Sequence, residues 1–171
     1  AFGIACYYAP FFFMVGNAVA QSAQPIISYN YGISRWKEIR EARKLLIVTS
    51  ISIGIFVALL FIFIPDKLVA FFVNTTSKAG QIAIEGFPYF ATGIVFFILN
   101  VTIVGYYQSV EQIRRATIFV FLRGFALLLP SFILLPKLLG NKGIWLAMPL
   151  AEVTTTLLIG ILFLIAFKKK V

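Results

Sequence analysis

The chain of 171 residues has little of the chemistry on which most enzymes depend. It contains one cysteine, Cys6, and no histidine. A single cysteine excludes an intramolecular disulfide, and the lack of histidine excludes a thiolate–imidazole metal site and histidine acid–base catalysis. The sequence also has no phosphate-binding glycine loop and no nucleophile elbow. We therefore predict that the protein is not an enzyme and has no resident cofactor.

Charge is also scarce: 12% of the residues are charged, and six acidic residues stand against fifteen basic ones, for a net charge of +9. A basic excess of this size could indicate a nucleic-acid partner. The basic residues, however, lie in short clusters between long apolar runs, which is typical of a membrane protein that follows the positive-inside rule. We expect a lipid bilayer, and no nucleic acid, as the partner.

Long apolar runs make up most of the sequence. Hydrophobic residues account for 61% of the chain and the mean hydropathy is +0.97, outside the range of soluble domains. Each run reaches the roughly 20 residues that a helix needs to cross about 30 Å of hydrocarbon. We predict an all-α integral membrane protein with five transmembrane helices, at about residues 10–32, 45–65, 86–110, 116–136 and 143–167.

The segments between these spans are short. Residues 1–9 read as the entry from a preceding helix that is not in the sequence, without the features of a signal peptide, so the sequence looks like part of a longer protein. Arg35–Lys44 is basic and helix-prone. Asp66–Val73 is amphipathic, which predicts a short helix at the membrane interface, and residues 74–77 form a polar turn.

Basic residues are divided unequally between the two sides of the predicted membrane. Ten lie on one side: Arg35, Lys37, Arg40, Arg43, Lys44, Arg114, Arg115, Lys168, Lys169 and Lys170. Four lie on the other: Lys67, Lys78, Lys137 and Lys142. The basic-rich side is expected to be cytoplasmic, which places the C-terminus inside.

Polar side chains interrupt the first span. Asn17, Gln21, Gln24 and Ser28 are spaced by four, three and four residues, so they share one helical face. Amides are costly in hydrocarbon without partners, so this face is expected to meet protein or water, and Pro25 is expected to bend the helix. We favour a transport pathway. The alternative is that these groups stabilise packing between helices.

A second face combines aromatic rings with one amide. Tyr89, Phe96, Asn100 and Tyr107 recur at spacings of seven, four and seven residues in the third span. Such a face would suit flat apolar or cationic molecules, through stacking and cation–π contacts. The alternative is ordinary aromatic packing, with the tyrosines as interface anchors.

Two charged residues lie within the last two spans. Arg123 and Glu152 stand on helices joined by a short loop, and their predicted depths differ by about one helical turn. We predict a buried ion pair that fixes the packing of these helices. The alternative is that Glu152 carries a proton or a sodium ion.

Three stretches of the sequence resemble the MATE family, the multidrug and toxin extrusion antiporters. They are Gly16–Gly32 (GNAVAQSAQPIISYNYG), Arg123–Pro130 (RGFALLLP) and Gly143–Glu152 (GIWLAMPLAE). The resemblance implies that the five spans are similar to helices eight to twelve of a twelve-helix transporter with two lobes. It further implies an N-terminal lobe of the same protein as partner, and efflux of drugs or organic cations across the plasma membrane in exchange for sodium ions or protons.

By this resemblance the two faces line a substrate cavity. The expected substrate contacts are Asn17, Gln21, Gln24, Tyr89, Phe96 and Asn100, with flexing points at Pro25 and Gly32. Some family members carry an acidic residue within the helix that corresponds to Gly86–Val110. Here Glu85 and Glu111 stand only at its ends, so the site of the coupling ion is expected in the N-terminal lobe.

Two other functions compete with drug efflux. A lipid-linked oligosaccharide flippase of the same superfamily would present several cationic side chains to pyrophosphate, and only Arg123 could do so here. A non-transporting membrane subunit would use its polar faces only for assembly.

Overall fold

The computed structural model describes the backbone of residues 1–168 and the side chains of residues 1–162. Lys169 and Lys170, which enter the charge count above, lie outside the described residues. The helices are α1 (Phe2–Cys6), α2 (Ala9–Gly32), α3 (Trp36–Phe63), α4 (Pro65–Ala70), α5 (Lys78–Ser109), α6 (Ile113–Phe121), the π-helical segment η1 (Leu122–Ala126), α7 (Leu128–Leu139) and α8 (Asn141–Lys168).

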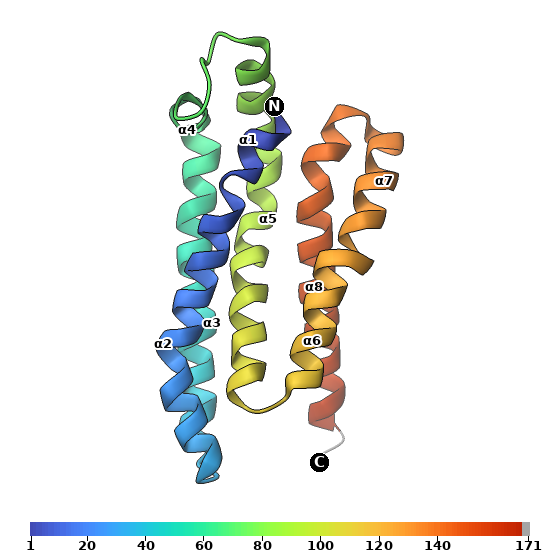
Figure 1. Cartoon of the computed structure of the whole chain (residues 1–171). Coiled ribbons are helices and arrows are strands. Elements are labelled where there is room, and N and C mark those ends of the chain that lie inside the picture. The colour runs from blue at the N-terminus through green and yellow to red at the C-terminus, as the bar shows by residue number, and fades with distance from the viewer. Residues whose placement is uncertain (169–171) are drawn as a thin grey trace.

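Five helices are long and apolar enough to cross a membrane, which confirms the predicted fold class. Within the described chain they run from Phe2 to Gly32, Trp36 to Phe63, Lys78 to Ser109, Ile113 to Leu139 and Asn141 to Leu162. α5 lies in the middle of the bundle and packs against α2, α3 and α8, while α7 packs on α8 (Figure 1). The α2–α3 and α5–α6 turns lie at one end of the bundle, and the N-terminus and the α7–α8 turn at the other (Figure 1).

Small residues allow α5 to approach its neighbours closely. A Cβ atom at Gly105 would collide with Ala20 of α2, and one at Gly86 would collide with the indole ring of Trp145 of α8. Small residues at such crossings are the usual means by which membrane helices pack, because lipid supplies little hydrophobic driving force between them. These contacts hold α5 close to α2 and to α8.

Two helices begin earlier than hydropathy alone predicts. α3 starts at Trp36, since the basic segment before Leu45 is rich in good helix formers and continues the span. α5 starts at Lys78, where the side chain of Ser77 caps the helix by accepting a hydrogen bond from the Gly80 amide (3.1 Å). Hydropathy marks the apolar part of a helix, and caps and propensity mark its ends.

The fourth span differs from the continuous helix predicted at 116–136. The Leu127 amide donates to the Leu122 carbonyl (2.8 Å), five residues back, and this bond closes the π-helical segment η1. Pro130 lies four residues after Ala126, where it lacks the amide that an α-helix would use, and in a regular α-helix its ring would crowd the Ala126 carbonyl. The break therefore has a sequence cause, and it places Arg123 inside η1.

Two turns at the same end of the bundle use the same backbone geometry. Ser34 and Glu111 both have φ of 57°, and each turn closes with an amide bonded to a carbonyl five residues earlier: Arg35 to Asn30 and Gln112 to Tyr107, both 2.9 Å. This is the Schellman arrangement that ends helices, with a non-glycine residue in its left-handed position.

Candidate functional site: a polar groove between α2 and α5

An open groove of about 570 Å³ runs along the crossing of α2 and α5. All its lining residues are uncharged: Asn17, Ala20, Gln21, Gln24, Pro25, Ser28, Gly105 and Gln108. The four polar residues that share a face of α2 in the sequence thus line one surface of the described chain. The predicted helical face is present as a groove.

The groove forms beside the tight crossing of α2 and α5, and its α2 wall is polar. Ala20 and Gly105 bring the two helices together, so the longer side chains of α2 on either side of Ala20 project outwards. Gln21 and Gln24 are exposed, and Asn17 is half-buried. The groove is therefore edged by amides that other groups can reach.

Most of these polar groups have no partner within the described part of the protein. In the described part of the chain, the side chains of Asn17, Gln21, Gln24 and Gln108 form no hydrogen bonds to protein groups. Ser28 is the exception, because its hydroxyl donates to the Ser109 carbonyl (3.1 Å). Each free amide offers two donors and one acceptor, so the groove can bind a solute through several neutral hydrogen bonds.

The two predicted flexing points differ in their surroundings. Pro25 lies inside α2 and lines the groove, where it removes one backbone donor. Gly32 is the last residue of α2, and a Cβ there would meet no atom within 4 Å. The left-handed residue of the following turn is Ser34, so the conformational freedom of glycine is not used at Gly32. The role of both residues as flexing points stays a prediction.

Asn100 does not lie in this groove. Its side chain is fully buried (0% exposed), and its Nδ2 donates to the Glu152 carbonyl (2.9 Å) and to Glu152 Oε2 (2.7 Å). Thr156 Oγ1 donates to Asn100 Oδ1 (2.9 Å). The amide faces α8 with its partners supplied by the protein, and the expected substrate contact of Asn100 stays a prediction.

Tyr89 and Phe96 also lie outside the groove. Tyr89 is 36% exposed and carries Lys142 Nζ over its ring (5.7 Å to the centroid), and Phe96 is half-buried. Tyr89 precedes Gly105 by a helical rise of about 24 Å. The structure therefore brings together the α2 residues of the predicted site and leaves the α5 aromatic residues apart from them.

The two intramembrane charges form an ion pair. Arg123 Nη2 lies 2.6 Å from Glu152 Oε1, and Nε of the same guanidinium lies 3.1 Å from that oxygen. The guanidinium also lies over the ring of Phe97 (4.4 Å to the centroid). With Asn100 on the second carboxylate oxygen, Glu152 is held by α5 and η1 together. That this network chiefly fixes packing stays our prediction.

Sequence reasoning missed two residues of these sites. Gln108 faces the groove from the end of α5, and Thr156 completes the buried network. Thr156 follows Glu152 by one helical turn, so a search for polar residues at that spacing would have found it. Gln108 gives no such signal, because Val104 and Gly105, one turn earlier on α5, are not polar. Among the described residues, no cluster of cysteine, aspartate and glutamate forms a metal-ligand set.

Five apolar helices, two of which border a polar groove, define a multi-pass membrane protein. A protein-family model, MatE, matches residues 1–133. The match covers more than half of the chain, which therefore belongs to the MatE family of membrane transporters. No curated protein and no solved structure matches the chain.

Proposed function

We propose that the protein takes part in secondary active efflux of drugs or organic cations across the plasma membrane, in exchange for sodium ions or protons. The observation that carries this proposal is the α2–α5 groove within the apolar spans, whose amides have no protein partners among the described residues. Unpaired amides are unfavourable there unless they meet water or a solute. We propose that Asn17, Gln21 and Gln24 contact the substrate, with Gln108 opposite them.

The uncharged lining suits a weakly hydrated organic cation. Amide oxygens can face its charge, and no fixed carboxylate holds it so strongly that release becomes slow. We propose that a second, N-terminal lobe faces this groove and contributes the site of the coupling ion. The basic end of the bundle, and with it the C-terminus, is proposed to face the cytoplasm.

A lipid-linked oligosaccharide flippase is less well supported. Its pyrophosphate would need cationic side chains, and none lines the polar groove. Arg123, the cation that sequence reasoning considered for this role, is paired with Glu152. No observation on the described residues favours this alternative over cation efflux.

Efflux of a fluorescent cation by the full-length protein tests the proposal. Replacing Gln21 or Gln24 with Leu removes a neutral hydrogen bond of about 1 kcal/mol, which corresponds to a roughly five-fold loss of efflux at subsaturating substrate. Gln81→Leu is the matched control, since Gln81 is an exposed glutamine near the start of α5 and outside the groove.

Efflux that is unchanged in both groove variants, at equal protein levels, would contradict the site. A loss that the control variant shares would point to a general effect of removing amides. Absence of efflux in the wild type, with every tested cation, would favour a non-transporting assembly subunit.

A further inference from the structure

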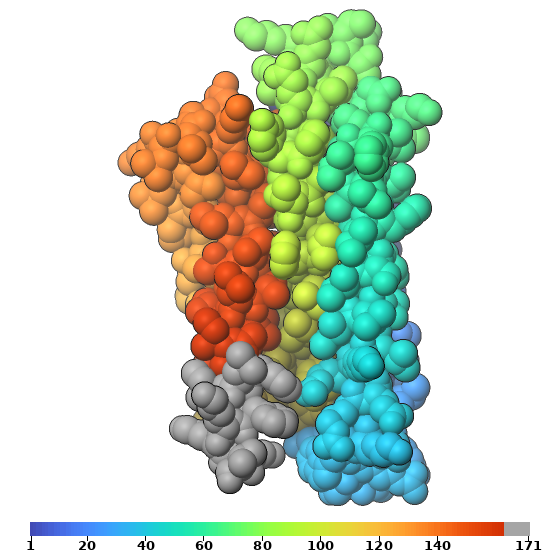
Figure 2. Space-filling model, turned by 180° about the vertical axis from the view of Figure 1, so that it is seen from behind, coloured from blue at the N-terminus to red at the C-terminus, as the bar shows by residue number. Residues whose placement is uncertain are grey.

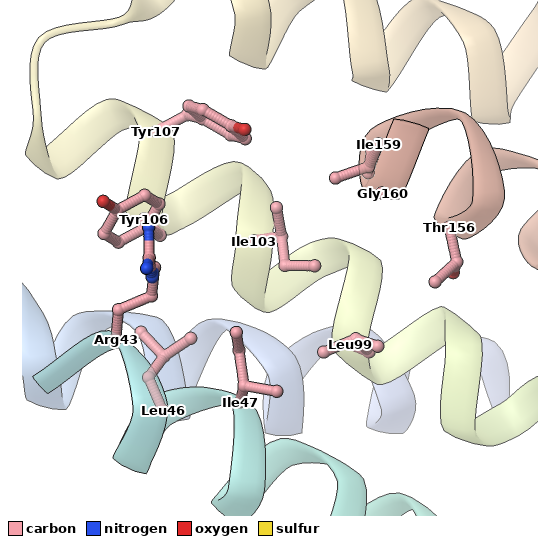
Figure 3. Close-up of a pocket in the computed structure, with 10 residues that line it drawn as sticks. All are labelled: Arg43, Leu46, Ile47, Leu99, Ile103, Tyr106, Tyr107, Thr156, Ile159 and Gly160. Atoms are coloured by element: carbon pink, nitrogen blue, oxygen red, sulfur yellow. The ribbon is translucent and has the colours of Figure 1, made fainter. Parts of the chain in front are cut away.

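A second groove, of about 280 Å³, lies on another face of the bundle, between α3, α5 and α8. In Figure 2, α5 lies recessed between α3 and α8 in the lower half of this face. The groove is lined along its length by aliphatic side chains, among them Ile47, Leu99, Ile103 and Ile159 (Figure 3). Unlike the α2–α5 groove, this one has almost no polar group between its two ends among the described residues.

The groove is nearly as long as half of the hydrocarbon core is thick. Along α5 it runs from Leu99 to Tyr107, a rise of about 12 Å. Half of a hydrocarbon core of about 30 Å is about 15 Å. One end reaches Arg43, which precedes the uncharged run that begins at Leu45, and the other end reaches Thr156. The groove therefore extends from the headgroup level towards the middle of the bilayer.

The two ends of the groove differ in polarity. At the end near the membrane surface, Arg43 lies over the ring of Tyr106 (5.8 Å to the centroid), and Arg115 lies over the ring of Tyr107 (5.9 Å). At the end near the middle of the bilayer, the Thr156 hydroxyl is hydrogen-bonded to Asn100 Oδ1. An occupant thus meets guanidinium and phenol groups at the surface and a satisfied hydroxyl at depth.

We propose that this groove binds one anionic phospholipid. An acyl chain lies along Leu99, Ile103 and Ile159, and the phosphate contacts the Arg43 guanidinium with the Tyr106 hydroxyl beside it. Guanidinium groups bind phosphate in a planar, charge-assisted geometry, and basic pockets between membrane helices favour anionic headgroups. The same guanidinium groups repel an organic cation, which sets this groove apart from the proposed cargo path.

Lipid retention measures the proposal directly and needs no transport activity. The full-length protein is placed in nanodiscs of equal phosphatidylglycerol and phosphatidylcholine, and bound lipid is counted by native mass spectrometry. Phosphatidylglycerol is expected to be retained in preference to phosphatidylcholine. Arg43→Gln is expected to lower that preference about five-fold, the effect of one basic residue at an anionic surface. Lys44→Gln, an exposed basic neighbour outside the groove, is the control and should leave the preference unchanged.

A second variant tests the apolar part of the site. Gly160 is exposed and lines the groove, and a Cβ there meets no atom within 4 Å, so Gly160→Leu adds bulk without a backbone clash. It is expected to lower retention of both lipids several-fold, whereas Ala18→Leu, at an exposed position of α2 outside the grooves, should not.

Three results would overturn the lipid site. One is equal retention of the two lipids by the wild type. Another is the same loss in Lys44→Gln as in Arg43→Gln, which would indicate diffuse surface charge. The third is displacement of the lipid by tetraphenylphosphonium that Gly160→Leu prevents, which would assign the groove to cationic cargo. If Arg43→Gln does not fold, the wild-type preference and Gly160→Leu still decide.

Discussion

Polar groups within the helices occupy two regions, which differ in whether the protein provides their hydrogen-bond partners. Around Glu152 the protein provides every partner: Asn100, Arg123 and Thr156 are joined by hydrogen bonds of 2.6 to 3.1 Å. In the α2–α5 groove, four amides have no protein partner among the described residues. Similar side chains are thus used either to hold helices together or to leave a surface open.

The difference shows how to separate structural from functional polar residues in a membrane. A satisfied network loses stability when any member is removed, because the remaining groups stay buried without partners. An open amide contributes little to stability in the folded protein, so its replacement should affect ligands more than folding. Stability and efflux should therefore respond in opposite ways in the two regions.

The largest effect is expected at the ion pair. Glu152→Leu leaves the Arg123 guanidinium with no carboxylate, and such a loss costs about 3–5 kcal/mol. Unfolding of the purified protein in bicelles should show this decrease. The double variant Arg123→Met, Glu152→Leu should recover most of it, since no charge then stays buried. A double variant no more stable than the single one would show that the network contributes more than charge pairing.

Asn100→Leu is expected to have the next largest effect. It removes the donor to Glu152 Oε2 and leaves the Thr156 hydroxyl without Asn100 Oδ1, at a cost of about 1–3 kcal/mol. The same unfolding assay measures the loss, and substrate affinity of the folded fraction should stay unchanged. A stable variant with weakened substrate binding would return Asn100 to the substrate path.

The smallest effect on stability is expected in the polar groove. Gln21→Leu and Gln24→Leu should change the free energy of unfolding by no more than about 0.5 kcal/mol, as at other exposed positions. The yield of monodisperse protein and its unfolding curve should match those of the wild type, although efflux falls. Destabilisation as large as that of Asn100→Leu would mean that these amides have structural partners.

Much of this arrangement follows from sequence patterns. The apolar runs predicted five spans, and the spacing from Asn17 to Ser28 predicted the polar face that now lines the groove. The depths of Arg123 and Glu152 placed them within reach of each other, and the structure contains the ion pair. These predictions depend on period and rise along a single helix, which sequence determines directly.

The remaining features depend on which helix covers which face. The spacing of Tyr89, Phe96, Asn100 and Tyr107 defined a face of α5, but periodicity does not reveal that α8 covers Asn100. The π-helical segment before Pro130 had a signal in the proline, yet a proline in a span is also compatible with a simple kink. Packing between helices decides which helix covers a given face, so the spacing of residues along one helix could not predict it.

The central position of α5 has a mechanical consequence. Gly105 and Gln108 border the polar groove, while Ile103, Tyr106 and Tyr107, one to two positions away along the helix, border the apolar one. Because these residues belong to one continuous helix, a rotation that moves those at one groove also moves those at the other. Any rotation of α5 therefore reshapes both grooves at once. By thermodynamic linkage, a ligand that favours one orientation of α5 at one groove changes the binding free energy of a ligand at the other groove, and the second ligand changes the binding free energy of the first by the same amount.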